Sequence, residues 1–578
     1  MSETLSGVAR AVPIHDSLLR AVGETQNQLY DVIVIGAGWS GLMACKYCLG
    51  EGLRTVVLES RDSIGGVWAY TDDGRYGGVM KTTHTTSSRC VTEISDFPMP
   101  ADYPSFPSHE QIRAYLEAYC ARFSLTEHIR FNRRVTRASK RGDLWQVKAS
   151  DGSEWFAPRV IVSSGVHQQP NDVSGDHRFR GYAGALMHSA GLKQIPPEWS
   201  GKTIVVWGGG ESASDVAFEA SRVASRVYFC IPNGVWIVPK RVDRLPGFPG
   251  SGPQILDHIT SRLRLRLSPT HRYSPFVAEY LEWAFGFNGH GQEAWRTEAP
   301  YNRSFFNKSA DVLARVRSGH VVPKRDIASC RGTTVRFSDG TSADVDAIVT
   351  CNGYTTSFPF LDPSVAAGTD PRKWFKHIFH NEDPSLAFVG FARPIFGSIP
   401  GLAELQGRYV AKVFCGARRL PGQAERRATI GRDAKLWNRH FRHTSLRIAG
   451  LVDHFQYADQ LAGLIGCRPN FWKLFFTSPR AWWQAITAPW HGCQFWLNDV
   501  KQHDRIFATL RSYSDNRVAQ AYLWLLLAPV LPLIALRRHL KVFLSEHFAF
   551  KPARGRDGIG RRGAGTLSIR AGRAGAYQ

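Results

Sequence analysis

The sequence predicts an α/β fold that contains two units of the same design. Twice along the chain, a short β-branched stretch runs into closely spaced glycines that open a helix. The first begins at Asp31 (DVIVIGAGWSG) and the second at Thr203 (TIVVWGGGESA). A buried parallel strand is apolar throughout, and a glycine-rich turn lets a helix start directly after it. At 578 residues the chain is also too long for one ordinary core. We therefore expect two Rossmann-like domains and a helical C-terminal region.

The first glycine-rich turn predicts an FAD site. Gly36, Gly38 and Gly41 form a GxGxxG pattern after the predicted strand 31–35. These glycines permit a tight turn, a close approach of pyrophosphate to the backbone, and packing of the helix on the strand. The next strand, 55–58, ends in Glu59, which suits a ribose 2′-hydroxyl and repels a 2′-phosphate. The GGVW at 65–68 is typical of FAD enzymes. The predicted FAD contacts here are Gly36, Ala37, Gly38, Trp39, Ser40, Gly41, Glu59, Val67 and Trp68.

The second glycine-rich turn predicts a nicotinamide site. A GxGxxA pattern follows the strand predicted at 203–207, and hydroxyl and acidic residues open its helix, where they can cap it or bond to phosphate. No acid ends the following strand at 226–231, while Lys240 and Arg241 lie a few residues on. NADP, as NADPH, is therefore compatible, and NADH stays open. The predicted contacts are Gly208, Gly210, Ser212, Ala213, Ser214 and Asp215.

Further motifs extend the pattern beyond the two turns. They are GGVWAYTDDGRYGGVMKTT, SDFPMPADYPSFP, VDAIVTCNGYTTSFPFL and IPGLAELQGRY, with a FxGxxxH-type fingerprint at Tyr182, Gly184 and His188. From about 30 to about 500 the chain resembles the flavin-containing monooxygenases, which are related to Baeyer–Villiger monooxygenases. The resemblance implies an FAD domain at 31–170 and 335–420. It also implies an NAD(P) domain at 171–334 with a helical insert at about 255–300, and Gln406 as a further FAD contact.

The stretch KTTHTTSSRCVTEISDFPMP, residues 81–100, is the candidate active-site wall. In the family that the chain resembles, this loop lines the flavin ring and usually carries an asparagine. Thr86 stands at that position, between Thr85 and Ser87, and its hydroxyl has one donor on a shorter arm than an amide. On a strand, His84 would share a face with Thr86. We therefore predict Thr86 and His84 as catalytic residues, and Thr85, Thr86 and Ser87 as cofactor contacts.

The resemblance implies an FAD-dependent monooxygenase. NAD(P)H reduces the flavin, oxygen adds at its C4a carbon as a hydroperoxide, and one oxygen atom passes to a nitrogen or sulfur nucleophile. The expected partners are molecular oxygen and a lipophilic small molecule, and a homodimer is left open. Two alternatives within the family are Baeyer–Villiger oxygenation of ketones and an NAD(P)H oxidase that leaks peroxide.

A third alternative comes from the charge. The formal charge of +23 and a Gly/Arg-rich tail suggest a non-catalytic nucleotide- or RNA-binding protein. The two intact glycine-rich turns disfavour this alternative, so no specific nucleic acid is expected. No metal site is expected either, because the 20 histidines show no ligand spacing.

The C-terminal sequence predicts a membrane anchor. Residues 519–536 (AQAYLWLLLAPVLPLIAL) are nearly as long as the roughly 20 apolar residues that span a bilayer. Pro529 and Pro532 disfavour a straight spanning helix, and the RRHLK that follows suits anionic headgroups. We therefore expect an intracellular, membrane-associated protein, at the endoplasmic reticulum if eukaryotic and otherwise cytoplasmic. A buried apolar hairpin is the alternative. Residues 1–30 are expected to form an extension and 551–578 a disordered basic tail.

Overall fold

The computed structural model describes residues 29–513, apart from position 75 and the stretches 244–252, 268–281, 283–284, 302–305, 367–369, 442–447 and 449. The chain divides into units 1–528 and 529–578, and every described residue belongs to the first unit. The predicted apolar anchor at 519–536 and the basic tail at 551–578 lie outside the described residues, as does nearly all of the N-terminal extension.

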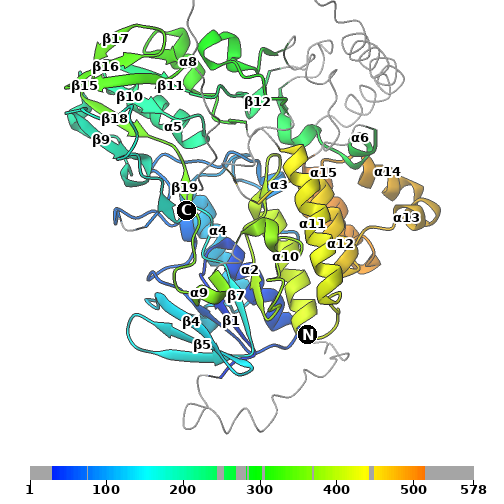
Figure 1. The fold of residues 1–578 in the computed structure, drawn as a ribbon. Helices are drawn as coiled ribbons and strands as arrows, with labels where there is room; N and C mark the ends of the chain where they lie inside the picture. The colour runs from blue at the N-terminus through cyan, green and yellow to red at the C-terminus, as the bar shows by residue number, and fades with distance from the viewer. Residues whose placement is uncertain are drawn as a thin grey trace, which may run out of the picture. The chain divides into compact units, whose positions relative to one another are not determined.

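The first glycine-rich turn lies on a five-stranded parallel sheet with strand order β20-β7-β1-β2-β3 (Figure 1). Helices α2 (Trp39–Gly50) and α10 (Ile399–Phe414) pack on one face, and an antiparallel sheet of β4, β5 and β6 packs on the other. Because both faces are covered, all four residues of β1 are buried. The strands are β1 Val32–Ile35, β2 Thr55–Leu58, β3 Ile129–Arg130, β4 Val135–Arg141, β5 Leu144–Ala149, β6 Glu154–Ala157, β7 Arg159–Val162 and β20 Leu386–Phe388.

The second glycine-rich turn lies on a sheet of the same design, with parallel order β14-β11-β10-β18-β9. Helices α5 (Glu211–Ala220) and α8 (Val312–Arg317) share a core with one face, and the antiparallel strands β15–β17 share a core with the other. The predicted fold class is confirmed. The strands are β9 Ala185–His188, β10 Thr203–Trp207, β11 Arg226–Cys230, β14 Val321–Lys324, β15 Ile327–Arg331, β16 Thr334–Phe337, β17 Ser342–Asp344 and β18 Ala347–Thr350.

Two neighbouring connections join the sheets. The outgoing strand β8 (Gln169–Pro170) and the returning strand β19 (Tyr354–Thr355) pair antiparallel to each other. Strand β18 still belongs to the second sheet, because it pairs with β10 and β9. The return to the first sheet therefore falls at 354–355, after the predicted limit of 335.

His188 braces this crossing. The Ala190 amide donates to His188 Nδ1 at 3.0 Å, so the other ring nitrogen carries the proton and donates to the Gly353 carbonyl at 3.0 Å. Burial lowers the pKa of His188, which keeps the ring neutral. The side chain thus ties the end of β9 to the returning connection.

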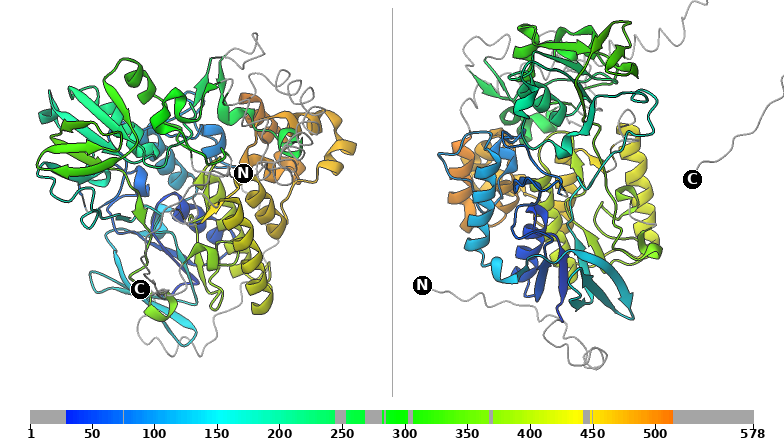
Figure 2. Two further views of the ribbon diagram at one scale, coloured as in Figure 1. Left: turned by 45° about the horizontal axis from the view of Figure 1, so that its top comes forward. Right: turned by 90° about the vertical axis from the view of Figure 1, so that its left-hand side faces the viewer.

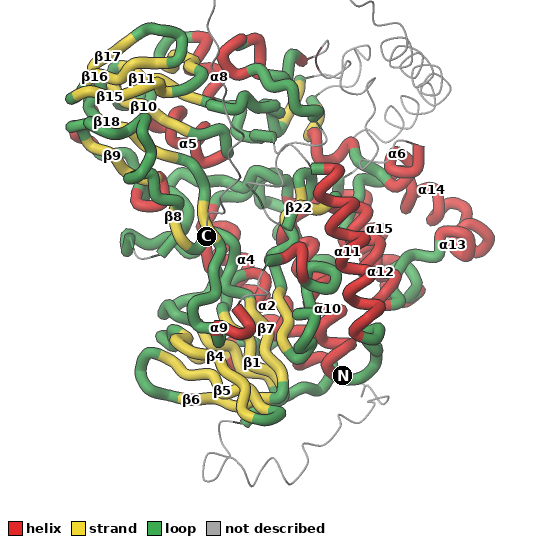
Figure 3. The backbone as a smooth tube through the Cα atoms, in the orientation of Figure 1, coloured by secondary structure: helices red, strands yellow, loops and turns green. Residues whose placement is uncertain are grey.

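The C-terminal region is helical, as predicted. Its helices gather in two groups, α10–α12 and α13–α15 (Figures 2 and 3). Gly407 lets α10 approach α2 closely, since an added Cβ would lie 3.2 Å from the Ala44 nitrogen. The helices are α11 Gln423–His440, α12 His454–Ile465, α13 Phe471–Thr477, α14 Pro479–Thr487 and α15 His503–Ser512. Shorter elements elsewhere are α3 Arg89–Thr92, α4 His109–Arg122, α6 Arg262–Leu267, α9 Pro363–Ala366, β12 Arg241–Val242, β13 Gln254–Ile255, β21 Arg393–Pro394 and β22 Leu451–Val452.

The predicted location at a membrane is corrected. Among the helices of the described ranges, none is long and apolar enough to cross a bilayer. Even α11, which runs for 18 residues, carries charged side chains along its length.

Candidate functional site

The first glycine-rich turn leaves bare backbone at the carboxyl end of β1. Gly36 has φ +104°, and an added Cβ there would lie 2.7 Å from the Ser163 carbonyl oxygen. A Cβ on Gly66 would lie 3.0 Å from the Gly38 Cα, so the GGVW segment crosses the turn at a distance that only glycines allow. Backbone amides without side chains suit a pyrophosphate.

Glu59, the acid at the end of β2, is fixed beside this turn. Its side chain accepts hydrogen bonds from the Ala37 amide at 2.6 Å and the Arg61 amide at 2.9 Å. The Arg61 guanidinium in turn donates to backbone carbonyls, including that of Gly66 at 3.0 Å. The carboxylate is buried and held in place, and its remaining lone pairs can accept from ribose hydroxyls.

A cavity of about 770 Å³ runs along the first turn and reaches the start of the second. Three buried polar atoms on its lining residues have no hydrogen-bond partner among the described residues, namely Trp39 Nε1, Thr85 Oγ1 and Ser163 Oγ. A buried polar group without a partner is unfavourable, so these atoms fit a polar ligand such as FAD. The predicted residues that line the cavity are Gly36, Gly38, Trp39, Ser40, Glu59, Val67, Trp68, Thr85, Thr86 and Ser87.

The wall at 85–88 is not the strand that the sequence suggests. Thr85, Thr86 and Ser87 line the cavity one after another, because the chain turns before entering the short helix α3. His84 is exposed, does not line the cavity, and its Nδ1 lies 3.0 Å from the Thr82 carbonyl. The expectation that His84 and Thr86 share one face is therefore wrong, and we no longer count His84 as a catalytic candidate.

The predicted insert is hydrogen-bonded to this wall. Asp257, from the 3-10 helix Leu256–Ile259, accepts from the Ser88 amide at 2.7 Å and pairs with Lys308 at 2.8 Å. Burial opposes the charge on Asp257, but Lys308 and the amide together lower its pKa. The chain that follows the second turn thus reaches the active-site wall.

The second glycine-rich turn has its own bracing. Gly208 has φ +143°, and an added Cβ would lie 2.4 Å from the Cys351 carbonyl oxygen. The Asn307 side-chain amide donates to the Gly210 carbonyl at 3.0 Å and to Ser214 Oγ at 2.7 Å. Burial raises the pKa of Asp215 to about 6. The bare turn fits a dinucleotide, but none of Gly208, Gly210, Ser212, Ala213, Ser214 and Asp215 lines the cavity.

Glu211, at the start of α5, is the residue that brings the second turn to the cavity. Burial raises the pKa of its carboxyl group, against the opposing effects of Lys308 and the Thr86 hydroxyl. Arg393 and Phe306 also line this end of the cavity. Glu211 occupies a variable position of the GxGxxA pattern, whereas no motif in the sequence marks Arg393 or Phe306.

Gln406 supports the cavity without lining it. Its side chain is fully buried, accepts from the Gly390 amide at 2.8 Å and donates to the Tyr457 hydroxyl at 2.8 Å. Gly390, which follows β20, does line the cavity, as do Ser163–Gln168 after β7. The carboxyl ends of parallel strands are where such folds bind ligands, and that rule identifies both segments.

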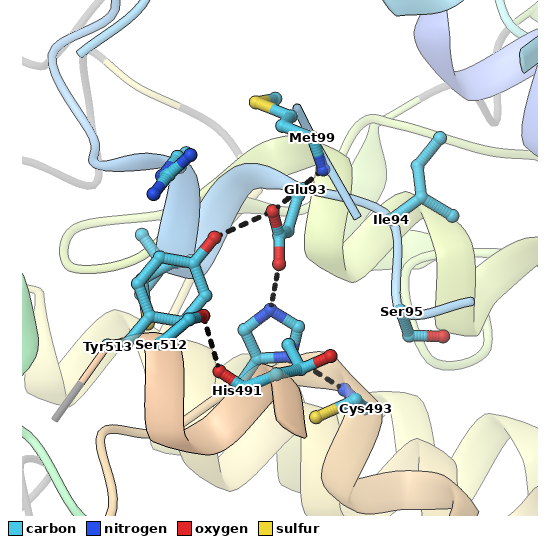
Figure 4. Close-up of polar contacts among 12 residues, drawn as sticks. Glu93, Ile94, Ser95, Met99, His491, Cys493, Ser512 and Tyr513 are labelled. Carbon is cyan, nitrogen blue, oxygen red and sulfur yellow. Dashed lines mark hydrogen bonds and ion pairs between the residues drawn. The ribbon is translucent and has the colours of Figure 1, made fainter. Parts of the chain in front are cut away.

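A buried polar cluster lies behind the wall (Figure 4). Glu93 Oε1 pairs with His491 Nε2 at 2.8 Å, and Glu93 Oε2 accepts from the Tyr513 hydroxyl at 2.7 Å and the Met99 amide at 3.0 Å. Burial disfavours a charge on His491, but Cys493 and Glu93 outweigh it and raise its pKa to about 10. The cluster fastens the C-terminal helices to the loop that carries Thr86.

Known proteins with similar sequences indicate the same architecture. Residues 30–511 match the flavin-binding monooxygenase-like family. Dimethylaniline monooxygenase (N-oxide-forming) 2 of Mus musculus is 32% identical over 489 residues, which cover 81% of this chain and 88% of that protein.

Solved structures share the fold at lower identity. S-allyl-L-cysteine S-oxygenase from Allium sativum has a TM-score of 0.56 at 22% identity, covering 84% of this chain and 99% of that one. Cyclohexanone monooxygenase from Rhodococcus sp. Phi1, bound to NADP⁺, has a TM-score of 0.55 at 16% identity, covering 76% and 98%.

Proposed function

Because this chain belongs to the flavin-binding monooxygenase-like family, it is a flavin-dependent monooxygenase that uses FAD and NADPH, and we propose that it oxygenates soft nitrogen or sulfur nucleophiles. The mouse relative is named for N-oxide formation, which supports this substrate class. A non-catalytic nucleotide- or RNA-binding role is set aside.

The observation that carries the proposal is the continuity of the cavity. It is lined at one end by the FAD-type turn with Glu59, and at the other by Glu211, the first residue of the helix behind the second turn. One cavity that adjoins the first turn and the residue directly after the second lets a nicotinamide and a flavin meet. Bound FAD would supply the oxygen-activating chemistry: with two electrons from NADPH, one atom of O2 goes to the substrate and the other leaves as water.

The residues of this chain position and shield that chemistry. Glu59 holds the ribose, and the glycine turn with the α2 N-terminus takes the pyrophosphate. Thr86, with one hydroxyl donor, is the residue that we assign to hydrogen bonding at the flavin ring. Phe306 and Ile395 contribute apolar side chains to the cavity lining, which disfavours water beside the reacting atoms.

The test is a product balance on the purified, flavin-containing protein. With NADPH and oxygen, we expect N,N-dimethylaniline to give its N-oxide and methyl phenyl sulfide its sulfoxide, in proportion to the NADPH consumed. Ester or lactone from ketones, with no N-oxide or sulfoxide, would establish the Baeyer–Villiger alternative instead. Peroxide as the sole product would identify an NADPH oxidase, and protein that binds no flavin would contradict the assignment altogether.

A further inference from the structure

Arg393 is a charged side chain in the cavity that the proposed chemistry does not use. Its backbone is fixed, because β21 pairs with β22 and the Arg393 amide donates to the Gly450 carbonyl at 2.8 Å. Its side chain lines the cavity, and no described residue forms a hydrogen bond or ion pair with the guanidinium. Burial lowers its pKa, which shows that the charge lacks full solvation.

Of the other cations that line the cavity, Arg134 is exposed and the remaining three are engaged. Arg133 pairs with Asp151 at 3.0 Å. Lys308 pairs with Asp257 at 2.8 Å, and the Arg61 guanidinium donates to carbonyls, including that of Ala69 at 2.9 Å. The cofactor phosphates have their own sites at the two glycine-rich turns. Arg393 is therefore left to a different anionic group.

The titratable neighbours of Arg393 do not neutralise it. Burial, together with the positive charge of Arg393, lowers the pKa of His167 to about 3, so that ring stays uncharged. Glu211 acts on Arg393 through space, but no ion pair joins them. Lys308 and Lys240 act on the same carboxyl group, so Glu211 is shared among three cations. A half-buried guanidinium that forms no ion pair is stabilised when a ligand brings a carboxylate to it.

Apolar side chains share the cavity lining with Arg393. The rings of Phe306 and Phe396 pack with their centroids 4.3 Å apart, and Phe306 and Ile395 line the cavity. A guanidinium beside an aromatic wall can hold a carboxylate with two parallel hydrogen bonds while the remainder of the ligand packs against the rings.

We propose that Arg393 binds the carboxylate of the substrate, and that the substrate class is a lipophilic carboxylic acid bearing the amine or thioether to be oxygenated. This proposal rests on the proposed function, because it specifies the substrate of that same site. Arg393 is in this account a specificity-determining residue.

The experiment compares ligands that differ by one charge. The probes are para-(methylthio)benzoate and methylthioacetate, each with its methyl ester, added to the FAD-containing enzyme. Binding is read from the change in flavin absorbance, and turnover from sulfoxide formed per NADPH. We expect at least one acid to bind about 10-fold tighter than its ester or better, the range for a charge-assisted hydrogen bond.

Variants identify the residue responsible. Arg393→Gln is expected to remove the preference for the acid while leaving ester binding unchanged, and Arg393→Lys to restore part of it. Arg137→Gln removes an exposed arginine outside the cavity and should leave the preference intact. The comparison of acid with ester in the unaltered enzyme does not depend on any variant folding.

The outcomes separate the two proposals. Equal binding of acid and ester in both pairs, or a preference that survives Arg393→Gln, would overturn the role of Arg393. Loss of FAD from Arg393→Gln and Arg393→Lys would also overturn it, since the side chain would then serve the flavin. Tight binding of an acid with no sulfoxide from acid or ester would instead contradict the oxygenation chemistry and leave the carboxylate site standing.

Discussion

At the scale of single residues, Gly36 has surroundings that admit no side chain. Its φ of +104° and the Ser163 carbonyl 2.7 Å from an added Cβ leave no room for a side chain. We expect Gly36→Ala to cost about 1–3 kcal/mol of unfolding free energy from backbone strain and to abolish FAD binding. The measurement is a urea unfolding curve together with flavin bound per chain.

Gly50→Ala is the matched control for that experiment. Gly50 lies in α2, and no atom stands within 4 Å of an added Cβ. Alanine is favoured over glycine in a helix by roughly 1 kcal/mol, so this variant should be as stable as the parent or more so. Equal behaviour of the two variants would refute the role assigned to Gly36.

The role that we propose for Thr86 at the flavin ring predicts that its hydroxyl couples oxygen use to product formation. Thr86→Val keeps the shape and removes the hydroxyl, and we expect product per NADPH to fall on the order of tenfold, with peroxide making up the difference. Thr86→Ser retains the donor and should stay near the parent value. The assay measures peroxide and oxygenated product in the same reaction. An unchanged ratio in Thr86→Val would remove this residue from the mechanism.

The sequence predicts some site residues well and others not at all. Gly36 and Glu59 follow from local rules, because the glycine-rich turn and the acid that ends the next strand lie in one continuous stretch of sequence. Asp257 and Arg393 reach the cavity from distant segments through tertiary packing, and no local pattern marks them. His84 was misplaced because hydroxyl-rich stretches suggest a strand as readily as a turn.

At the scale of elements, the buried pair of Glu93 and His491 couples the C-terminal helices to the wall. The folded protein holds the His491 proton more tightly than the unfolded chain, since its pKa rises from 6.5 to about 10. Its stabilising contribution is therefore complete below pH 6.5 and is lost as the pH rises through 10. We expect the stability difference between the parent and His491→Gln to shrink over that interval, as measured by urea unfolding.

Replacing the other partner gives a larger effect. Glu93→Gln leaves a buried charge without a counter-ion and is expected to cost about 3–5 kcal/mol near neutral pH. Tyr513→Phe removes one hydrogen bond to the same carboxylate and should cost about 1–3 kcal/mol. Equal costs for the two variants would mean that Glu93 acts through packing rather than charge.

Elements with a regular apolar pattern are predictable from the chain. The strands at 55–58 and 203–207 agree with the structure at both ends. The predicted second FAD segment, 335–420, includes β18, which pairs within the second sheet instead. The sequence of a buried parallel strand does not indicate which strands it will pair with. The short helix α3 is set by the contacts around it rather than by its own four residues.

At the scale of the whole protein, transfer between the cofactors requires the two sheets to keep their alignment, and His188 braces their crossing. We expect His188→Leu to leave FAD content unchanged and to slow reduction of the flavin by NADPH by about tenfold or more, since misplacement at this scale is costly. Anaerobic stopped-flow absorbance measures that rate. His188→Gln, which can still donate to the Gly353 carbonyl, should lose less. Equal reduction rates in all three proteins would show that the brace is dispensable.

The antiparallel pairing of β8 with β19 has a practical consequence. Since the chain leaves and re-enters the first sheet by adjacent residues, the segment between Pro170 and Tyr354 is inserted at one place in the flavin-binding core. We expect that a homologous segment with a different nicotinamide preference can be exchanged at these two residues if it keeps an acceptor for the Ser88 amide in place of Asp257.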